Sequence, residues 1–154
     1  MKPQVGEMAP DFTAMVVEGE KESEISLKSL RGEVVVLVFY PKDNTPGCTI
    51  QACSLRDGWD EIKMKARVFG VSADSVASHK KFISKWHLPY PLIADVDKSI
   101  ATAFGVWVEK TMFGKKYMGM ERSTFVIAGD GRIKAVLEKV SPLSHREKLW
   151  KLLG

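Results

Sequence analysis

The sequence lacks any long hydrophobic segment. Its longest uninterrupted apolar run is Val34–Tyr40, whereas a helix needs about 20 apolar residues to cross a bilayer. The first residues, Met1–Glu7, contain neither the apolar core nor the small-residue cleavage site of a secretory signal. The sequence therefore predicts no membrane span and no signal peptide, and we expect a cytoplasmic protein.

Cysteine and histidine are also scarce, with two cysteines and three histidines in 154 residues. His79, His87 and His145 are scattered and have no carboxylate partner at metal-ligand spacing, so we predict no metal site and no cofactor. Ordinary disulfides are reduced in the cytosol, and cysteines there are more often chemical than structural. We therefore expect Cys48 and Cys53 to carry chemistry.

No large block of one charge is present. The 23 basic residues are interspersed with 19 acidic ones, for a net charge of +4. The only adjacent basic pairs are Lys80-Lys81 and Lys115-Lys116, and no motif that reads a nucleic-acid groove accompanies them. The charges are typical of a solvated surface, and we predict no nucleic-acid partner.

Repeats, low-complexity tracts and linker-like stretches are absent as well. The length is typical of one domain, and the 45% hydrophobic content is enough for a core. We therefore expect a single globular domain over residues 1–154.

The pattern of apolar residues predicts alternating strands and helices. The β-branched and aromatic run Val34–Tyr40 indicates a strand buried on both faces, at the centre of a sheet. Further strands are expected at Asp11–Val17, Arg67–Ser72 and Tyr90–Ala94, and a hairpin joins Ser123–Ala128 to Arg132–Leu137. Helices are expected at Thr49–Met64, Val76–Trp86 and His145–Leu153, a polar loop at Glu18–Glu24 and a turn at Leu27–Gly32. Strand-helix-strand alternation implies parallel pairing, and hence an α/β fold with a mixed sheet.

The segment Pro41–Thr49 lies between the buried strand and the first turn of a predicted helix. The unpaired N–H groups and partial positive charge of a helix N-terminus favour a thiolate over a thiol, which makes Cys48 a reactive cysteine. Pro46-Gly47 leaves an open backbone just before the sulfur, where N–H groups can meet an oxyanion or a peroxide oxygen. The loop is thus interpreted as a binding site for small oxygen species.

Two further loop residues have both a functional and a structural interpretation. The hydroxyl of Thr45, three residues before Cys48, can turn toward the thiolate or the substrate, or simply cap the helix. Pro41 can shield the pocket from water, or simply end the strand. Their joint spacing carries more information than either residue.

Pro41, Thr45 and Cys48 form a P-x-x-x-T-x-x-C pattern that resembles the active site of peroxiredoxins. Gly47-Cys48-Thr49 with Arg56-Asp57 is similar to the bacterioferritin comigratory protein, or peroxiredoxin Q, branch of that family. Comparable segments follow in the same order along nearly the whole chain, at Ala9–Phe12, Leu88–Asp95, Gly105–Trp107 and Arg122–Ile127.

The resemblance implies a thioredoxin-like fold, in which helices flank a central mixed β-sheet. It also implies an antioxidant peroxidase that reduces hydrogen peroxide and organic hydroperoxides, takes electrons from thioredoxin or a similar dithiol, and is a monomer. Cys48 then corresponds to the peroxidatic cysteine, Thr45 to the pocket hydroxyl, Pro41 to the shielding proline and Arg122 to the distant arginine. The backbone at Gly47 is expected to contact substrate.

Arg122 suits this chemistry on its own account. A permanently charged guanidinium can keep a neighbouring thiolate ionised and stabilise developing charge on peroxide oxygens. The alternative is a surface ion pair with Glu121. Many relatives have an acid in place of Gln51, so Gln51 is left out of the expected catalytic set.

Cys53 matches the resolving cysteine of many members of the branch. Five residues on a helix differ by about 140° and about 7.5 Å of rise, too far for a disulfide with Cys48. We expect the first helical turns to unwind, helped by Gly58, before Cys53 attacks a Cys48 sulfenic acid to form an intramolecular disulfide. The alternative is a buried, inert thiol.

Two other classes of protein remain open from the residues alone. A thiol-disulfide reductase of the same fold usually carries C-x-x-C, whereas this chain has C-x-x-x-x-C. A partner-binding module on the same scaffold would need neither cysteine. The tryptophans and the Met112–Met120 stretch are expected to pack in the core and at the pocket rim, where methionines would line an approach for larger hydroperoxides.

Overall fold

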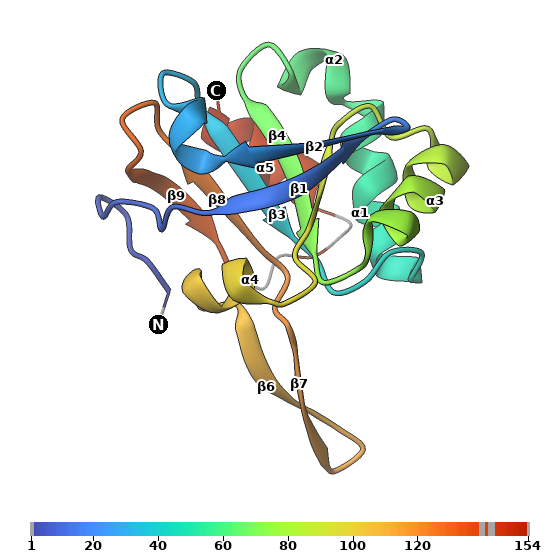
Figure 1. Cartoon of the computed structure of the whole chain (residues 1–154). Helices are drawn as coiled ribbons and strands as arrows, with labels where there is room; N and C mark the ends of the chain where they lie inside the picture. Colours follow the sequence, from blue (N-terminus) through green and yellow to red (C-terminus); the bar gives the residue numbers. More distant parts are fainter. Residues whose placement is uncertain (1, 139–140, 142–143, 154) are drawn as a thin grey trace.

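The computed structural model describes residues 2–138, 141 and 144–153. Within them lies a seven-stranded sheet of order β2-β1-β5-β4-β3-β8-β9, with a separate two-stranded sheet, β6-β7 (Figure 1). The larger sheet contains β1 (Thr13–Glu18), β2 (Lys21–Ser26), β3 (Val35–Phe39), β4 (Arg67–Ser72), β5 (Leu92–Ala94), β8 (Ser123–Ile127) and β9 (Ile133–Leu137). The smaller sheet contains β6 (Trp107–Met112) and β7 (Lys115–Met120). The helices are the 3-10 turn η1 (Leu27–Leu30), α1 (Pro46–Asp57), α2 (Trp59–Ile62), α3 (Val76–Trp86), α4 (Ser99–Ala103) and α5 (His145–Leu153).

Strand β3 lies in the interior of the sheet, next to the middle strand β4 and not at the predicted centre, and all its residues are buried. It pairs in parallel with β4 and antiparallel with β8, and β4 pairs in parallel with β5. The sheet is therefore mixed, with helices between its parallel strands, which confirms the predicted thioredoxin-like α/β fold.

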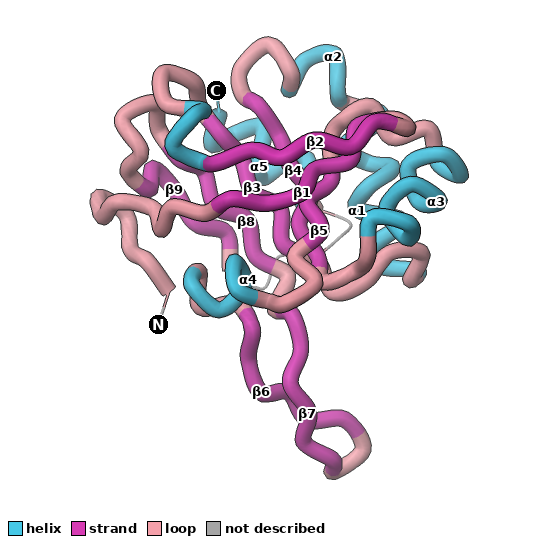
Figure 2. Tube along the Cα trace, in the orientation of Figure 1, coloured by secondary structure: helices cyan, strands magenta, loops and turns pink. Residues whose placement is uncertain are grey.

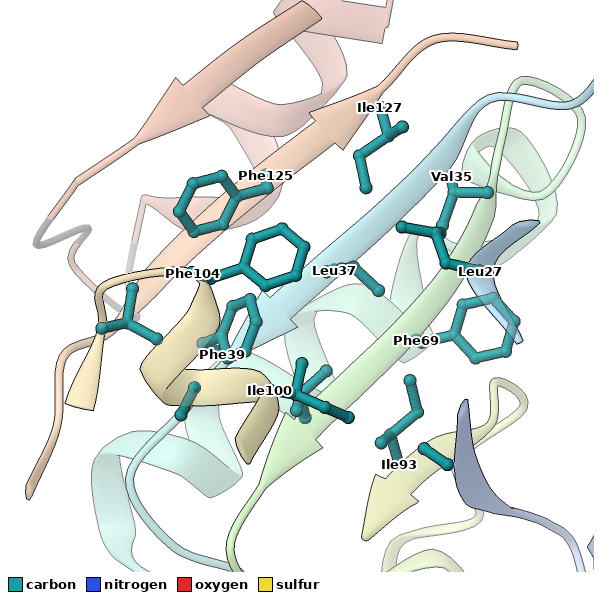
Figure 3. Packing of buried hydrophobic residues seen from close by; sticks show 14 of the residues in the cluster. Leu27, Val35, Leu37, Phe39, Phe69, Ile93, Ile100, Phe104, Phe125 and Ile127 are labelled. Atoms are coloured by element: carbon teal, nitrogen blue, oxygen red, sulfur yellow. The ribbon is translucent and has the colours of Figure 1, made fainter. Parts of the chain in front are cut away.

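Each face of β3 packs against a different layer. On one face, Leu37 and Phe39 pack in the same cluster as the rings of Phe104 and Phe125, next to α4 (Figure 3). The ring of Phe104 lies 5.4 Å from that of Phe39 and 5.1 Å from that of Phe125. On the other face, β3 contributes Val36 and Val38 to a second cluster that includes residues of α1, α3 and α5. Because both faces are covered, every position of the strand is apolar.

Several elements differ from the predictions. The expected polar loop Glu18–Glu24 largely belongs to β2, which pairs with β1 along its whole length. As an edge strand with mostly exposed side chains, β2 has no apolar alternation to reveal it. The single expected helix Thr49–Met64 is divided at Gly58 into α1 and α2, because glycine costs about 1 kcal/mol in a helix interior.

The stretch Met112–Met120 was expected to pack in the core and at the pocket rim, and this is wrong for most of it. It forms the end of the β6-β7 hairpin, which projects from the body (Figures 1 and 2). Met112 and Met118 are more than half exposed, Phe113 is 98% exposed, and only Met120 of these is buried. Phe113 and Gly114 both have positive φ, as in the tight turns that match strand twist.

The tryptophans also lie nearer the surface than expected. Trp59, Trp86 and Trp107 are half-buried and pack against the two core clusters, whereas Trp150 is 36% exposed. Among the described residues, no helix has the length and apolar character needed to span a bilayer.

Gly70 lies in buried β4, opposite Leu92 of β5, where a side chain has no room. A Cβ at this position would lie 2.6 Å from Leu92 Cδ2 and 3.1 Å from Tyr40 Cε1. Gly70→Ala is therefore expected to lower the free energy of unfolding by about 1–3 kcal/mol through overpacking, measured by urea titration. Leu92→Ala provides the control. If steric conflict is the cause, the double variant loses less than the sum of the two single variants, and strict additivity would contradict the explanation.

Candidate active site at the start of the first helix

Cys48 is the third residue of α1. Thr45 is the extended N-cap residue (φ −82°, ψ 152°), and Pro46 occupies the first helical position, where its fixed φ favours the helix and its missing N–H costs nothing. The N–H groups of Gly47 and Cys48 belong to the first turn, which has no intrahelical acceptors for them. The structure therefore confirms that Cys48, 2% exposed, lies at a helix N-terminus.

Arg122 contacts the sulfur although it is 74 positions away in the sequence. It immediately precedes β8, and Ser123 of β8 is in register with Phe39 at the end of β3. This pairing brings the guanidinium to the loop that follows β3, where Nη2 of Arg122 donates to Cys48 Sγ over 3.3 Å. A permanent positive charge thus lies in direct contact with the thiol.

The surface ion pair considered for Arg122 is not what the structure shows. Glu121 is buried and pairs instead with Lys2, at 2.6 Å between Oε2 and Nζ. The second nitrogen of the guanidinium, Nη1, donates to Gln51 Oε1. Both described contacts of the Arg122 guanidinium are therefore with residues of α1.

Gln51 is a site residue that the sequence reasoning left out. It follows Cys48 by three positions, which places both on the same face of α1, and it is only 2% exposed. Its oxygen accepts from Arg122, while Nε2 is buried with no hydrogen-bond partner among the described residues. The i,i+3 spacing from the reactive cysteine was the available signal. The amide oxygen thus holds Arg122, and the amide nitrogen has no described partner.

The other loop residues lie close by, without described contacts to the sulfur. Thr45 Oγ1 donates to the Lys42 carbonyl over 3.0 Å and makes no capping bond. Pro41 is half-buried directly after Tyr40, and Gly47 is half-buried in the first turn of α1. The roles of Thr45, Pro41 and Gly47 toward a substrate remain predictions.

Cys53 also lies on α1 and is half-buried, and both cysteines are free thiols. The preceding turn is held by Tyr90, whose hydroxyl donates to the Ala52 carbonyl over 3.1 Å. Burial, and then the neighbouring Cys53, raise the pKa of Tyr90, so this hydroxyl keeps its proton. Cys48 and Cys53 are five positions apart on this helix, a rise of about 7.5 Å, which is too far for a disulfide. A bond between them therefore requires α1 to open.

The surroundings of the site differ on its two sides. Behind Cys48 lies a small apolar space of about 10 Å³, bounded by residues such as Val38 and Phe82. On the Arg122 side, an open groove of about 730 Å³ runs along β6 and β7 and is lined in part by Lys110 and Tyr117. Burial, and then the charge of Arg122, lower the pKa of Lys110. Because Arg122 itself lines this groove, solvent reaches its guanidinium from there.

The three histidines occupy quite different environments. His87 is exposed and ends α3, whereas His79 and His145 are fully buried. His79 Nδ1 lies 2.7 Å from Asp43 Oδ2, a carboxylate partner 36 residues away that no ligand spacing along the sequence indicates. Within the described part of the chain, no group of three or more His, Cys, Asp or Glu residues is arranged to hold a metal ion.

Comparison with known proteins places this geometry in a family. Residues 5–136 match the AhpC/TSA family. A relative in Coxiella burnetii is 47% identical over 146 residues, covering 94% of this chain and 95% of the relative. Peroxiredoxin Bcp of Bacillus subtilis is 42% identical, with 94% and 91% coverage. A structure of the Xanthomonas campestris bacterioferritin comigratory protein matches with a TM-score of 0.85 at 34% identity, covering 92% of this chain and 89% of that one.

The chain belongs to the AhpC/TSA family, and within it to the bacterioferritin comigratory protein, or peroxiredoxin Q, branch. It is accordingly a peroxiredoxin, a thiol peroxidase that reduces peroxides.

His145 gives the fold a pH dependence that can be measured. Its Nε2 bonds Thr124 Oγ1 at 2.7 Å, and burial, followed by the charge of Arg122, lowers the pKa of His145 from 6.5 to about 4. As the pH falls from 6.5 to 4, the unfolded chain binds the proton first, so stability is lost in this window. The loss is expected to approach about 3 kcal/mol.

The comparison is with His145→Gln, whose amide keeps a partner for Thr124 but does not titrate. Urea unfolding at several pH values is expected to show a steeper decline for the wild type than for the variant. Parallel curves would contradict the assignment, because all carboxylates are common to the two proteins.

Proposed function

We propose that Cys48 is the peroxidatic cysteine of this peroxiredoxin and that Arg122 activates it. The observation that carries the proposal is the 3.3 Å contact between Arg122 Nη2 and Cys48 Sγ at the N-terminus of α1. The guanidinium and the helix terminus both favour a negatively charged sulfur. The thiolate is the form of the sulfur that attacks a peroxide.

The first step is a displacement at a peroxide oxygen. The Cys48 thiolate attacks one oxygen of the peroxide, a sulfur–oxygen bond forms and the oxygen–oxygen bond breaks. The leaving oxygen takes a proton and departs as water or an alcohol, and Cys48 is left as a sulfenic acid. Sulfur is oxidised by two electrons and the peroxide is reduced by two, so the step is balanced.

The remaining residues orient the peroxide. Arg122 and the N–H groups of Gly47 and Cys48 face the region where negative charge develops, and such fixed donors lower the barrier. The free Nε2 donor of Gln51 adds a hydrogen bond to the same region. Thr45 supplies a hydroxyl that must leave the Lys42 carbonyl to reach the substrate, and Pro41 limits the access of water.

The substrates we infer are hydrogen peroxide and organic hydroperoxides. The similar Xanthomonas campestris protein has alkyl peroxide reduction activity. The open groove beside Arg122 offers space for the organic group while the peroxide oxygens contact the guanidinium. This arrangement supports a broad substrate range.

Cys53 completes the cycle in this proposal. After α1 opens, the Cys53 thiol attacks the sulfenic acid of Cys48, a disulfide forms and water leaves. Thioredoxin or a similar dithiol then reduces the disulfide by thiol–disulfide exchange and is itself oxidised. Because both sulfurs belong to one chain, the cycle needs no second subunit, and we expect a monomer.

Replacing each cysteine by serine separates the two roles. Cys48→Ser is expected to abolish peroxide consumption in the presence of a thioredoxin system, because the remaining thiol, Cys53, lies outside the first turn of α1 and has no described contact with Arg122. Cys53→Ser is expected to consume one equivalent of peroxide in forming the sulfenic acid and then stop turning over; in excess peroxide a second equivalent converts Cys48 to sulfinic acid, detected by mass spectrometry.

Retained turnover in Cys48→Ser would overturn the assignment of the nucleophile. Turnover of Cys53→Ser at the wild-type rate, without over-oxidation, would overturn the resolving role alone. An insulin-reduction assay in parallel tests for the reductase activity that a C-x-x-C protein would have.

Arg122→Gln tests the guanidinium. The amide can still donate a hydrogen bond but carries no charge, so kcat/KM for hydrogen peroxide is expected to fall about a hundredfold. The matched control is Arg67→Gln, which removes an exposed arginine paired with Glu33 at 3.3 Å. Equal rates in the two variants would show that Arg122 does not activate Cys48.

A further inference from the structure

A buried carboxylate holds the loop that carries Pro41 and Thr45. Asp43, in the middle of this loop, is 5% exposed. Its Oδ1 accepts from the Tyr40 hydroxyl over 2.6 Å and its Oδ2 accepts from Ser78 Oγ over 2.8 Å. Its backbone N–H donates to the carboxylate of Asp74 over 2.8 Å. The loop is thus attached to the residue that follows β3, to α3 and to the segment after β4.

His79 adds a further attachment. Its Nε2 lies 2.9 Å from the Ile93 carbonyl, and its Nδ1 lies 2.7 Å from Asp43 Oδ2. A carbonyl only accepts, so Nε2 carries a hydrogen. A second proton lies between Nδ1 and Oδ2, whichever atom holds it. His79 therefore links the loop to β5 through two hydrogen bonds in the core.

Neighbouring contacts support this arrangement. Burial, and then the charge of Asp43, raise the pKa of Tyr40 well above its ordinary value, so its hydroxyl remains a donor. The next loop residue, Asn44, has a positive φ of 60° and accepts from Trp86 Nε1 over 3.3 Å. Thr45 is then the N-cap residue of α1, and Cys48 follows three residues later.

The position of this anchor, the hydrogen-bonded pair Asp43 and His79, affects where the Cys48 sulfur lies. Cys48 is carried by the loop and α1, whereas Arg122 is carried by the start of β8. Their 3.3 Å contact therefore depends on where the loop holds the first turn of the helix. A displacement of about 1 Å can reduce a rate about a hundredfold.

We propose that Asp43 and His79 are positioning residues that keep Cys48 within reach of Arg122 and hold the loop in place while α1 opens. Neither residue has a described contact with Cys48. The inference rests on the proposed function of Cys48, and it adds a polar pair that the active-site motif does not contain.

Two amide substitutions divide the contacts of His79. The amide nitrogen of His79→Asn falls near the position of Nδ1 and can keep the bond to Asp43. That of His79→Gln falls near the position of Nε2 and can keep the bond to Ile93 while losing Asp43. His87→Asn is the matched control, because His87 is exposed and adopts a left-handed conformation (φ 54°) that asparagine tolerates.

The measurement is the single-turnover rate constant for oxidation of Cys48 by hydrogen peroxide, followed by stopped-flow tryptophan fluorescence. His79→Gln is expected to lose tenfold or more, on the order expected for a misplaced reacting group. His79→Asn is expected to stay within about threefold of the wild type, because it keeps the bond to Asp43. His87→Asn is expected to leave the rate unchanged, and reduction of the disulfide by thioredoxin should be unaffected in every variant.

Urea unfolding of each variant accompanies the kinetics. A wild-type rate in folded His79→Gln would overturn the proposal, as would equal losses in the Asn and Gln variants. If His79→Gln does not fold, Ser78→Ala replaces it. That variant removes one bond to Asp43 and is expected to lower the oxidation rate about threefold, and no loss would overturn the proposal.

Hydrogen exchange of the Asp43 amide separates this proposal from the proposed function. Faster exchange in His79→Gln than in His79→Asn reports loosening of the loop without any peroxide chemistry. If the wild-type protein did not react with peroxide, the peroxidatic role of Cys48 would fail, while the difference in exchange would still support the anchor. If the exchange rates were equal, the anchor would fail whatever the activity.

Discussion

The contact between Arg122 and Cys48 is the interaction on which the site depends. Its partners are separated by 74 positions in sequence, and they meet because the start of β8 is in register with the end of β3. The strand that leads into the reactive loop thus also positions the arginine. Since both faces of β3 are packed, this edge of the sheet is a rigid support for a small, charged and mostly buried site.

In our proposal, the same helix must be held in place and also be able to open. Apolar residues such as Leu55 fasten α1 to the sheet, and the Tyr90 hydroxyl holds the Ala52 carbonyl. The helix nevertheless ends at Asp57, with Gly58 as its C-cap residue, and its first turn has no side-chain cap. In our proposal the firm attachment lies before the helix, at Asp43 and His79, so that Cys48 moves relative to a fixed loop.

Local pattern predicted the elements that have a clear periodicity or composition. The bounds expected for β4, α3 and α5 agree with the structure, because each has a well-marked apolar pattern. The edge strand β2, the short helix α4 and the β6-β7 hairpin were not predicted. β2 is polar, α4 is only five residues long, and the hairpin projects from the body (Figure 1), so none has the apolar pattern that identifies buried elements.

By itself, the sequence predicted a reactive cysteine at Cys48 and identified the family to which the chain belongs. Cys48 directly follows Pro46-Gly47 in the first turn of a helix. The effect of a helix start on a thiol comes from neighbours within a few residues, so it can be predicted from the local sequence. Only the tertiary structure decided which distant groups reach that segment: Gln51 bonded to Arg122, and Asp43 bonded to His79. These contacts depend on strand register and helix packing, which bring together residues whose spacing in sequence carries no sign of their proximity.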